Sequence, residues 1–294
     1  MNYFVEGLQG SGKSTLVQKL SELNPDCTAV REGDYSPVEL AWCAYMDKAK
    51  IKEILDKYSA IRSEIEEKTH SEGDKRIVCY TQIITDIPGF HKDLEQYEIY
   101  NNRVSYEDFK SIIFKRYNDW SRSIAPSGKA GTAVDSERDM IFECSLFQNI
   151  VEDMILFRCA SDDEIVEFYK DVRAALDGDS DDITDQKKKK EYHIFYLKAE
   201  NVRGNLMVIR KERSDDDGNE LWFPLMMSYF MDCPYSKKMG LGSEEDLVQH
   251  FIHRQELELR ICREVFPDKH TVLTSKKYTD EEILLIQEQI KNIS

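Results

Sequence analysis

The sequence predicts an α/β fold of three layers, with a five-stranded parallel sheet and a large, mostly helical insertion between the second and third strands. Five short apolar segments alternate with segments of helical spacing, and this alternation is typical of a parallel sheet covered by helices. Residues 35–138 interrupt the alternation after the second apolar segment. We therefore expect residues 1–34 and 139–294 to form a core domain, and residues 35–138 to form the insertion.

The first apolar segment leads directly into a glycine-rich loop. We expect a strand at residues 2–6 and a helix at residues 13–23. The loop between them reads Gly7-Leu8-Gln9-Gly10-Ser11-Gly12-Lys13-Ser14-Thr15 and matches the pattern G-x-x-x-x-G-K-[ST]. Because the pattern stands between a strand and a helix, where its chemistry requires it, we interpret it as a phosphate-binding loop, or P-loop.

Each residue type in this loop suits a bound nucleoside triphosphate. Glycines allow positive φ and let successive N–H groups point toward one anion. We expect Lys13 to contact the β- and γ-phosphates, and the Ser14 hydroxyl to bind Mg²⁺, while the helix dipole adds positive potential. ATP and Mg²⁺ are therefore the expected cofactors. The predicted nucleotide-binding residues are Gly7, Gly10, Ser11, Gly12, Lys13, Ser14 and Thr15.

Acidic residues follow the second and third apolar segments. The second, at residues 27–31, leads into Glu32-Gly33-Asp34, and the third, at residues 139–145, contains Glu143. Open α/β sheets bind ligands beyond the carboxyl ends of their strands. We expect Glu32 or Asp34 to act as a general base, although the spacing also fits a polar turn. We expect Glu143 to hold Mg²⁺ directly or through water.

The insertion has the spacing of helices rather than of alternating strands and helices. We expect helices at residues 39–48, 50–68 and 105–120, and either a strand or a buried segment at 77–84. Its expected role is to cover the molecule that accepts the phosphoryl group. The candidate contacts to this acceptor, each of them also a candidate core residue or turn residue, are Asp34, Trp42, Tyr45, Tyr80 and Gln82.

Basic side chains gather late in the chain, within residues 203–219. They can form a lid in which Arg210 and Arg213 stabilise the transferred phosphoryl group, or they can be ordinary surface charges. We also expect a loop at residues 125–131 and a solvated, charged tract at 177–190. Further helices are expected at 146–158, 162–176, 202–213 and 243–265, with strands at 192–197 and 270–273 and a closing helix after the capping box at 279–282.

The composition narrows the range of partners. The 294 residues include 56 Asp and Glu against 40 Lys and Arg, and the net charge is −16. Proteins that follow a nucleic-acid backbone usually present a basic surface, so we expect no nucleic-acid partner. The sequence shows no apolar run long enough to span a membrane and no signal peptide, so we expect a cytoplasmic protein without membrane association. The seven scattered cysteines fit a reducing compartment.

Three stretches of the chain resemble a known family. The stretch from Phe4 to Thr15 is similar to the opening of the thymidylate kinase and deoxynucleoside kinase group of P-loop kinases. Arg31-Glu32-Gly33 resembles the Glu-Pro that ends the second strand in deoxynucleoside kinases, and Phe142-Glu143-Cys144-Ser145 resembles their Glu-Arg-Ser. The resemblance covers residues 1–34, 139–160 and 190–215. Gly33 replaces the proline of that family, and Cys144 replaces its arginine.

The resemblance implies a P-loop NTPase fold and phosphoryl transfer. It also implies that Glu32 takes the proton of the acceptor hydroxyl and that Glu143 helps to hold the metal. We therefore expect an ATP-dependent kinase that acts on a nucleoside, a nucleotide or a similar small metabolite. The identity of the acceptor, the choice between ATP and GTP, and the oligomeric state stay open, with a homodimer as one candidate.

Two other functions are compatible with a P-loop. One is an ATPase or GTPase that works as a nucleotide-dependent switch, with the insertion binding a partner. The other is phosphorylation of nucleic-acid ends, which requires a basic groove and is disfavoured by the net charge of −16.

Overall fold

The computed structural model describes residues 1–122, 138–178 and 189–293. The loop expected at residues 125–131 and most of the charged tract at 177–190 lie outside the described residues. The chain folds into two compact units. The first comprises Met1–Ala29, Met140–Arg173 and Glu191–Ser294, and the second comprises Val30–Asp139 and Ala174–Lys190.

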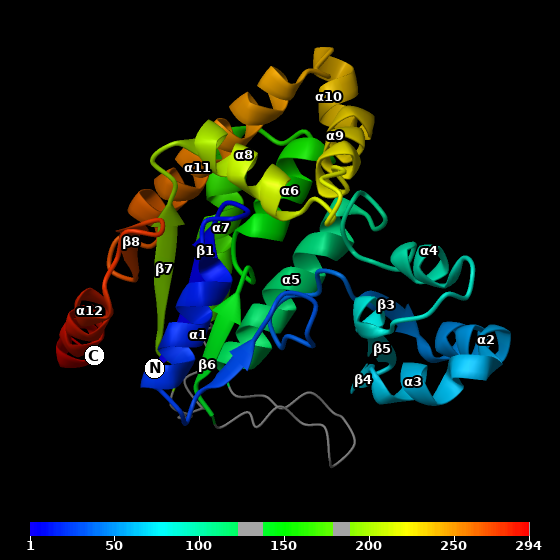
Figure 1. Ribbon diagram of the computed structural model, residues 1–294. Coiled ribbons are helices and arrows are strands. Elements are labelled where there is room, and N and C mark those ends of the chain that lie inside the picture. The colour runs from blue at the N-terminus through cyan, green and yellow to red at the C-terminus, as the bar shows by residue number, and fades with distance from the viewer. Residues whose placement is uncertain (123–137, 179–188, 294) are drawn as a thin grey trace. The chain divides into compact units, whose positions relative to one another are not determined.

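A five-stranded, all-parallel sheet forms the centre of the first unit. Its order is β2-β6-β1-β7-β8, so β1 lies between β6 and β7 (Figure 1). This confirms the predicted α/β class and the parallel sheet, with the third predicted strand beside the first. The strands are β1 (Asn2–Gly7), β2 (Thr28–Val30), β6 (Met140–Glu143), β7 (Tyr192–Lys198) and β8 (His270–Thr274).

Side chains alternate between the two faces of this sheet, as they must along any strand. Tyr3 and Val5 of β1 pack on one face with Leu16 and Leu20 of α1 (Lys13–Leu23) and with Ile283 of α12 (Asp280–Ile293). These two helices therefore cover one side of the sheet through the apolar stripe that their spacing predicts.

The opposite face packs against other helices. Phe4 stacks on Phe142 with ring centroids 4.8 Å apart, and the Tyr196 hydroxyl donates to Glu258 of α11 (Glu244–Val265) at 2.7 Å. Helices therefore lie on both sides of the sheet, an arrangement compatible with the three layers expected. The remaining helices of this unit are α6 (Gln148–Leu156), α7 (Asp162–Asp177, which crosses into the second unit), α8 (Val202–Glu212), α9 (Trp222–Asp232), α10 (Pro234–Met239) and α11 (Glu244–Val265).

The second unit contains a small antiparallel sheet that the sequence did not predict. The sheet has the order β3-β5-β4, and β5 pairs with both neighbours in antiparallel register. A tight turn at Gly73, with φ of 56°, joins β4 to β5. The strands are β3 (Ala44–Asp47), β4 (Thr69–Glu72) and β5 (Lys75–Val78).

Helices complete the second unit, but not all where they were expected. The helix predicted at 39–48 is wrong, because residues 44–47 pair with β5. The Asp47 side chain then accepts from the Lys50 amide at 2.9 Å and caps a helix that begins at Lys48. The helices are α2 (Lys48–Lys57), η1 (Ser59–Ile61), α3 (Arg62–Glu67), η2 (Tyr80–Gln82), α4 (Phe90–Glu95) and α5 (Tyr106–Ser121), so the expected helix at 50–68 is interrupted.

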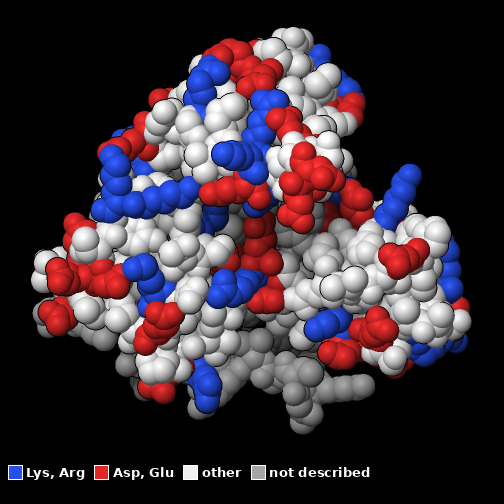
Figure 2. Space-filling model, in the orientation of Figure 1, with Lys and Arg blue, Asp and Glu red and all other residues white. Residues whose placement is uncertain are grey.

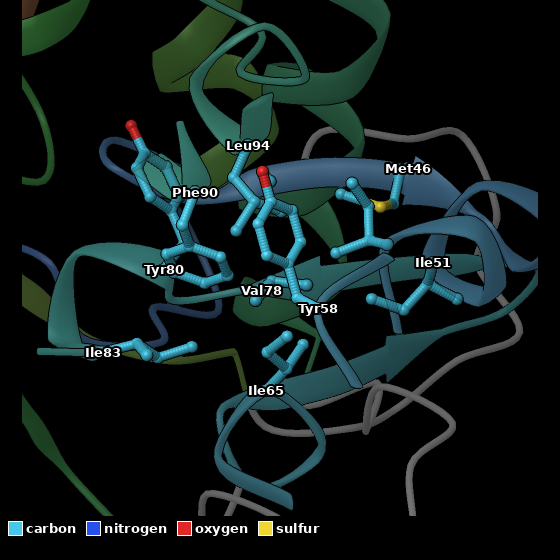
Figure 3. Packing of buried hydrophobic residues seen from close by; sticks show 11 residues of the cluster. Met46, Ile51, Tyr58, Ile65, Val78, Tyr80, Ile83, Phe90 and Leu94 are labelled. Atoms are coloured by element: carbon cyan, nitrogen blue, oxygen red, sulfur yellow. The ribbon is translucent and has the colours of Figure 1, made fainter. Parts of the chain in front are cut away.

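The second unit has its own apolar core. Figure 3 shows the side chains of Tyr58, Ile65, Val78 and Phe90 gathered in one interior, although they come from separate elements. The rings of Tyr58 and Phe90 meet edge to face, with centroids 5.1 Å apart. This core holds the small sheet against α2, α3 and α4.

No helix among the described residues combines the length and the apolar character that crossing a membrane requires.

Candidate functional site

The loop between β1 and α1 depends on glycines in a conformation that other residues rarely adopt. Gly7, Gly10 and Gly12 have φ of 138°, 71° and 92°. A Cβ atom at Gly7 would lie 2.6 Å from the carbonyl oxygen of Leu197, and one at Gly10 would lie 2.2 Å from Cγ1 of Ile209. Two of the three predicted glycines are thus required by space as well as by backbone conformation.

Lys13 folds back over the same loop. Its side chain is buried, and Nζ donates to the carbonyl oxygens of Gly7 at 2.9 Å and Leu8 at 2.8 Å. These bonds use two of the three donors of the ammonium group. The loop therefore carries a fixed positive charge at the position that the sequence pattern predicts.

The start of α1 has the features of an anion site. Gly12 occupies the N-cap position in the left-handed conformation, and no described side chain caps the helix. The buried hydroxyl of Ser11 has no hydrogen-bond partner among the described residues. The first-turn amides and this hydroxyl are therefore suitable donors for phosphate oxygens. Thr15, the last of the predicted loop residues, is exposed on the first turn.

Ser14 and Glu143 meet, although 129 positions separate them in the sequence. The Ser14 hydroxyl donates to a carboxylate oxygen of Glu143. The contact follows from the sheet, because β6 pairs with β1 and places Glu143 opposite Val5, near the carboxyl end of both strands. A hydroxyl and a carboxylate are the hard oxygen ligands that suit Mg²⁺, which also takes ligands from phosphates and water.

The described residues contain no cluster of three or more His, Cys, Asp or Glu side chains that could hold a metal ion. The pair of Ser14 and Glu143 is a smaller set of ligands than such a cluster. Mg²⁺ usually binds through one or two carboxylates together with substrate phosphates, so the pair fits this ion.

Helix α8, from the predicted lid, packs directly on the loop. Asn205 donates to the carbonyl oxygen of Gln9 at 2.7 Å, and Ile209 lies against Gly10. The loop therefore contacts the first half of the segment at 203–219.

The two lid arginines have partners that follow the lid in the sequence, at residues 220–223 and at the start of α11. Arg210 forms ion pairs with Glu220 and Glu244 and lies over the Phe223 ring, with the guanidinium carbon 4.1 Å from the centroid. Arg213 lies over the ring of Trp222 at 5.1 Å. A contact of either arginine with a phosphoryl group stays a prediction, and Arg210 would have to exchange its acidic partners to make one.

A buried ionic network reaches the loop from α11, and the sequence analysis missed it. Arg254 is fully buried and donates to the Gln9 side chain and to Glu152, at 2.7 Å in each case. Its Nε lies 3.2 Å from Glu258, and His250 lies 3.0 Å from Glu152. The sequence does contain a signal for this network: charged or titratable residues recur every four positions, at 250, 254 and 258, on the apolar side of a long helix.

Glu6, the last residue before the loop, holds the start of α6. Its carboxyl accepts from the amides of Leu146 at 2.7 Å and Phe147 at 3.1 Å. Complete burial raises the pKa of Glu6 to about 8, although these amide hydrogen bonds act in the opposite direction. This side chain joins β1 to the segment that follows Glu143.

A second group of predicted residues assembles in the second unit, around the turn at Glu32 to Asp34. Asp34 accepts from the Arg31 amide at 2.9 Å and from the Gln82 side chain at 2.7 Å. The Trp42 ring nitrogen donates to Glu32 at 3.0 Å, and this ring is 47% exposed. Three of the five residues predicted at the acceptor, together with the candidate base, therefore form two hydrogen-bonded pairs at this turn.

The two predicted tyrosines are placed differently. Tyr80 is buried in the apolar core, and its hydroxyl donates to Glu98 at 2.7 Å. Burial, together with the nearby charge of Glu72, raises the pKa of Tyr45 to about 12. Tyr80 has the partner and the burial of a core residue, which does not favour its predicted contact with an acceptor.

No protein-family model matches this chain, and no curated protein matches it. The functional argument therefore depends on the geometry of the two groups of residues.

Proposed function

We propose that this protein is an ATP- and Mg²⁺-dependent kinase of the P-loop NTPase class. It transfers the γ-phosphoryl group to a hydroxyl or phosphate of a small molecule, such as a nucleoside, a nucleotide or a similar metabolite. The observation that carries the proposal is the contact of Ser14 with Glu143 beside the loop that holds Lys13. A loop with only a structural role has no need of a carboxylate from the neighbouring strand.

In this proposal each residue of the loop has one task. Lys13, the Ser11 hydroxyl and the first-turn amides of α1 hold phosphate oxygens, and Ser14 and Glu143 hold Mg²⁺. When bound, Mg²⁺ neutralises charge on the phosphate oxygens. The chain orients the phosphates, because β1, β6 and α1 hold the groups that contact them in fixed positions.

Glu32 is the better candidate for the base of the acceptor hydroxyl. Asp34 uses both of its carboxylate oxygens to close the turn, one toward Arg31 and one toward Gln82. Glu32 accepts a hydrogen bond from Trp42, a partly exposed ring that a planar acceptor could contact. Asp34 then keeps Glu32 in position by fixing the turn.

The net charge does not favour a nucleic-acid acceptor. Figure 2 shows Asp and Glu interspersed with Lys and Arg on the displayed face of the described residues, in agreement with a net charge of −16. A phosphate backbone is bound most favourably by a continuous basic surface.

The second candidate function is a nucleotide-dependent switch. The contacts of Asn205 with Gln9 and of Ile209 with Gly10 favour it, because they link the loop to α8. A switch hydrolyses the nucleotide and changes conformation without forming a phosphorylated product from a small acceptor.

The nucleotide site is tested by calorimetric titration with ATP in the presence of Mg²⁺. We expect Lys13→Ala to weaken binding about tenfold to a hundredfold, the range for loss of a charged hydrogen bond. Lys19→Ala is the matched control, because Lys19 lies on the same helix and its ion pair with Asp280 is exposed. Equal affinities of wild type and Lys13→Ala would contradict the proposal.

The transfer step is tested with labelled ATP and a panel of nucleosides, nucleotides, sugars and aminoglycosides. With the acceptor found, we expect Glu32→Gln to lower the turnover about 10²- to 10⁴-fold and to leave ATP affinity unchanged. Full turnover in this variant would remove Glu32 as the base. Hydrolysis without a labelled product from any acceptor would favour the switch.

A further inference from the structure

Two cysteines of the second unit face each other at one end of the small antiparallel sheet. Cys43 directly precedes β3, and Cys79 directly follows β5. Because Ala44 pairs with Val78, continuing this register places Cys43 opposite Cys79. Their Sγ atoms lie 3.6 Å apart, and both thiols are free. A disulfide requires about 2.05 Å between the sulfurs, so a small movement would join them.

The surroundings distinguish the two thiols. Cys43 donates a hydrogen bond to the sulfur of Cys79, and this bond, with a further contact from His70, lowers the pKa of the Cys79 thiol despite its burial. The pKa of the Cys43 thiol is raised, because Cys43 donates this hydrogen bond and is buried. The His70 ring is held by stacking on Tyr35, with centroids 4.1 Å apart. Cys79 is therefore the nucleophile of the pair, and Cys43 is the resolving thiol.

We infer that Cys43 and Cys79 form a reversible intramolecular disulfide on exposure to hydrogen peroxide. The sulfur of Cys79 attacks one peroxide oxygen, the O–O bond breaks, and Cys79 becomes a sulfenic acid while the other oxygen leaves as water. The sulfur of Cys43 then attacks the sulfenic sulfur, and a second water leaves as the S–S bond forms. Two thiols and one peroxide thus give one disulfide and two waters, with two electrons passing to the peroxide.

The burial of the pair restricts the oxidant. Cys43 and Cys79 are 0% and 1% exposed, which admits a small peroxide more readily than a bulky disulfide such as oxidised glutathione. Cys27 and Cys159 are more exposed and are also free thiols. Proximity and thiolate character, rather than exposure, therefore select the Cys43–Cys79 pair.

The disulfide would act next to the turn that carries the candidate base. Trp42, the hydrogen-bond partner of Glu32, precedes Cys43, and Gln82, the partner of Asp34, lies three residues after Cys79. A covalent bond between the two strand ends would fix the relative positions of these partners. The modification itself does not depend on the proposed kinase activity.

The experiment treats the full-length protein with increasing hydrogen peroxide, blocks the remaining thiols in denaturant, and maps the peptides by mass spectrometry without reduction. We expect a cross-linked peptide that contains Cys43 and Cys79 and that disappears on treatment with dithiothreitol. Cys43→Ser should remove the cross-link and leave Cys79 open to further oxidation. Cys159→Ser is the control, and it should form the cross-link as the wild type does.

Peptide mapping of the wild type alone can overturn the inference, even if a variant fails to fold. Oxidation confined to Cys27 and Cys159, with Cys43 and Cys79 still blocked as free thiols, would contradict it. Oxidation of Cys79 to the sulfinic acid in the presence of Cys43, without a cross-link, would also contradict it, because the resolving step would then be absent.

Discussion

Gly10 lies beneath Ile209 in a conformation that disfavours any side chain. The φ of 71° and the nearby Ile209 side chain are two different reasons why position 10 requires glycine. Two substitutions can measure them independently. Gly218, in the same unit, has φ of 83° and no atom within 4 Å of an added Cβ. Gly10 and Gly218 therefore share the backbone constraint and differ in the space around them.

We expect Gly10→Ala to lower the free energy of unfolding more than Gly218→Ala does. Positive φ costs both variants about 1–2 kcal/mol, and overpacking against Ile209 adds about 1–3 kcal/mol at Gly10. Denaturant unfolding measures the difference. Adding Ile209→Ala to Gly10→Ala should reduce the cost of the glycine substitution; an unchanged cost would assign it to the backbone alone.

Burial also gives a single carboxyl an effect on the pH dependence of stability. The folded protein retains the proton of Glu6 up to pH about 8, whereas an unfolded chain releases it near the ordinary value of 4.5. The folded state therefore binds more protons between these values. The contribution of Glu6 to stability is present below pH 4.5 and is lost as the pH rises toward 8.

We expect the free energy of unfolding to decline less steeply between pH 5 and about 8 in Glu6→Gln than in wild type. The amide keeps an oxygen acceptor for the amides of Leu146 and Phe147 and cannot ionise. Glu22→Gln, on exposed α1 surface, is the control and should follow the wild-type slope. Equal slopes in all three proteins would show that Glu6 does not take up a proton on folding.

At the level of secondary structure elements, local signals and tertiary contacts explain different parts of the outcome. Helix α1 occupies its expected residues, 13–23, because its apolar spacing and its glycine-rich start are local features. Strands β3 and β4 were missed because they are short and contain polar residues, so they depend on pairing with β5. Helix α9 was not predicted either. It carries few polar residues, so its sequence shows little periodic alternation of apolar and polar positions.

The candidate site shows the same division. The loop from Gly7 to Thr15 could be predicted because its residues are contiguous and each position has a chemical role. To predict the contact of Ser14 with Glu143, one further fact was needed, namely that β6 lies beside β1 in the sheet. The partners of Arg210 and Arg254 that lie outside the helices carrying these arginines could not be predicted, because the spacing of residues within one helix does not indicate what packs against it.

At the scale of the whole molecule, the two compact units have separate apolar cores. The nucleotide residues belong to the first unit, whereas the candidate base and its partners belong to the second. We therefore expect the nucleotide to change the dynamics of the first unit and the acceptor to change those of the second.

We expect ATP with Mg²⁺ to slow amide hydrogen exchange at residues 8–15, at the end of β6 and along α8, because these segments hold or contact the loop. Strands β3 to β5 of the second unit should exchange at unchanged rates. Hydrogen exchange mass spectrometry measures both sets of peptides, with Lys13→Ala as the control that loses the effect. Protection confined to the second unit would contradict the assignment of the nucleotide site.

The contact between Gly10 and Ile209 also has a consequence for how this sequence can diverge. A side chain at position 10 fits only if the one at position 209 becomes smaller, since Ile209 already occupies that space. We therefore expect the two positions to vary together among homologous chains, with glycine kept wherever a large residue stands opposite. Such paired variation, 199 positions apart in the sequence (209 minus 10), would identify chains that pack α8 on the loop in the same way.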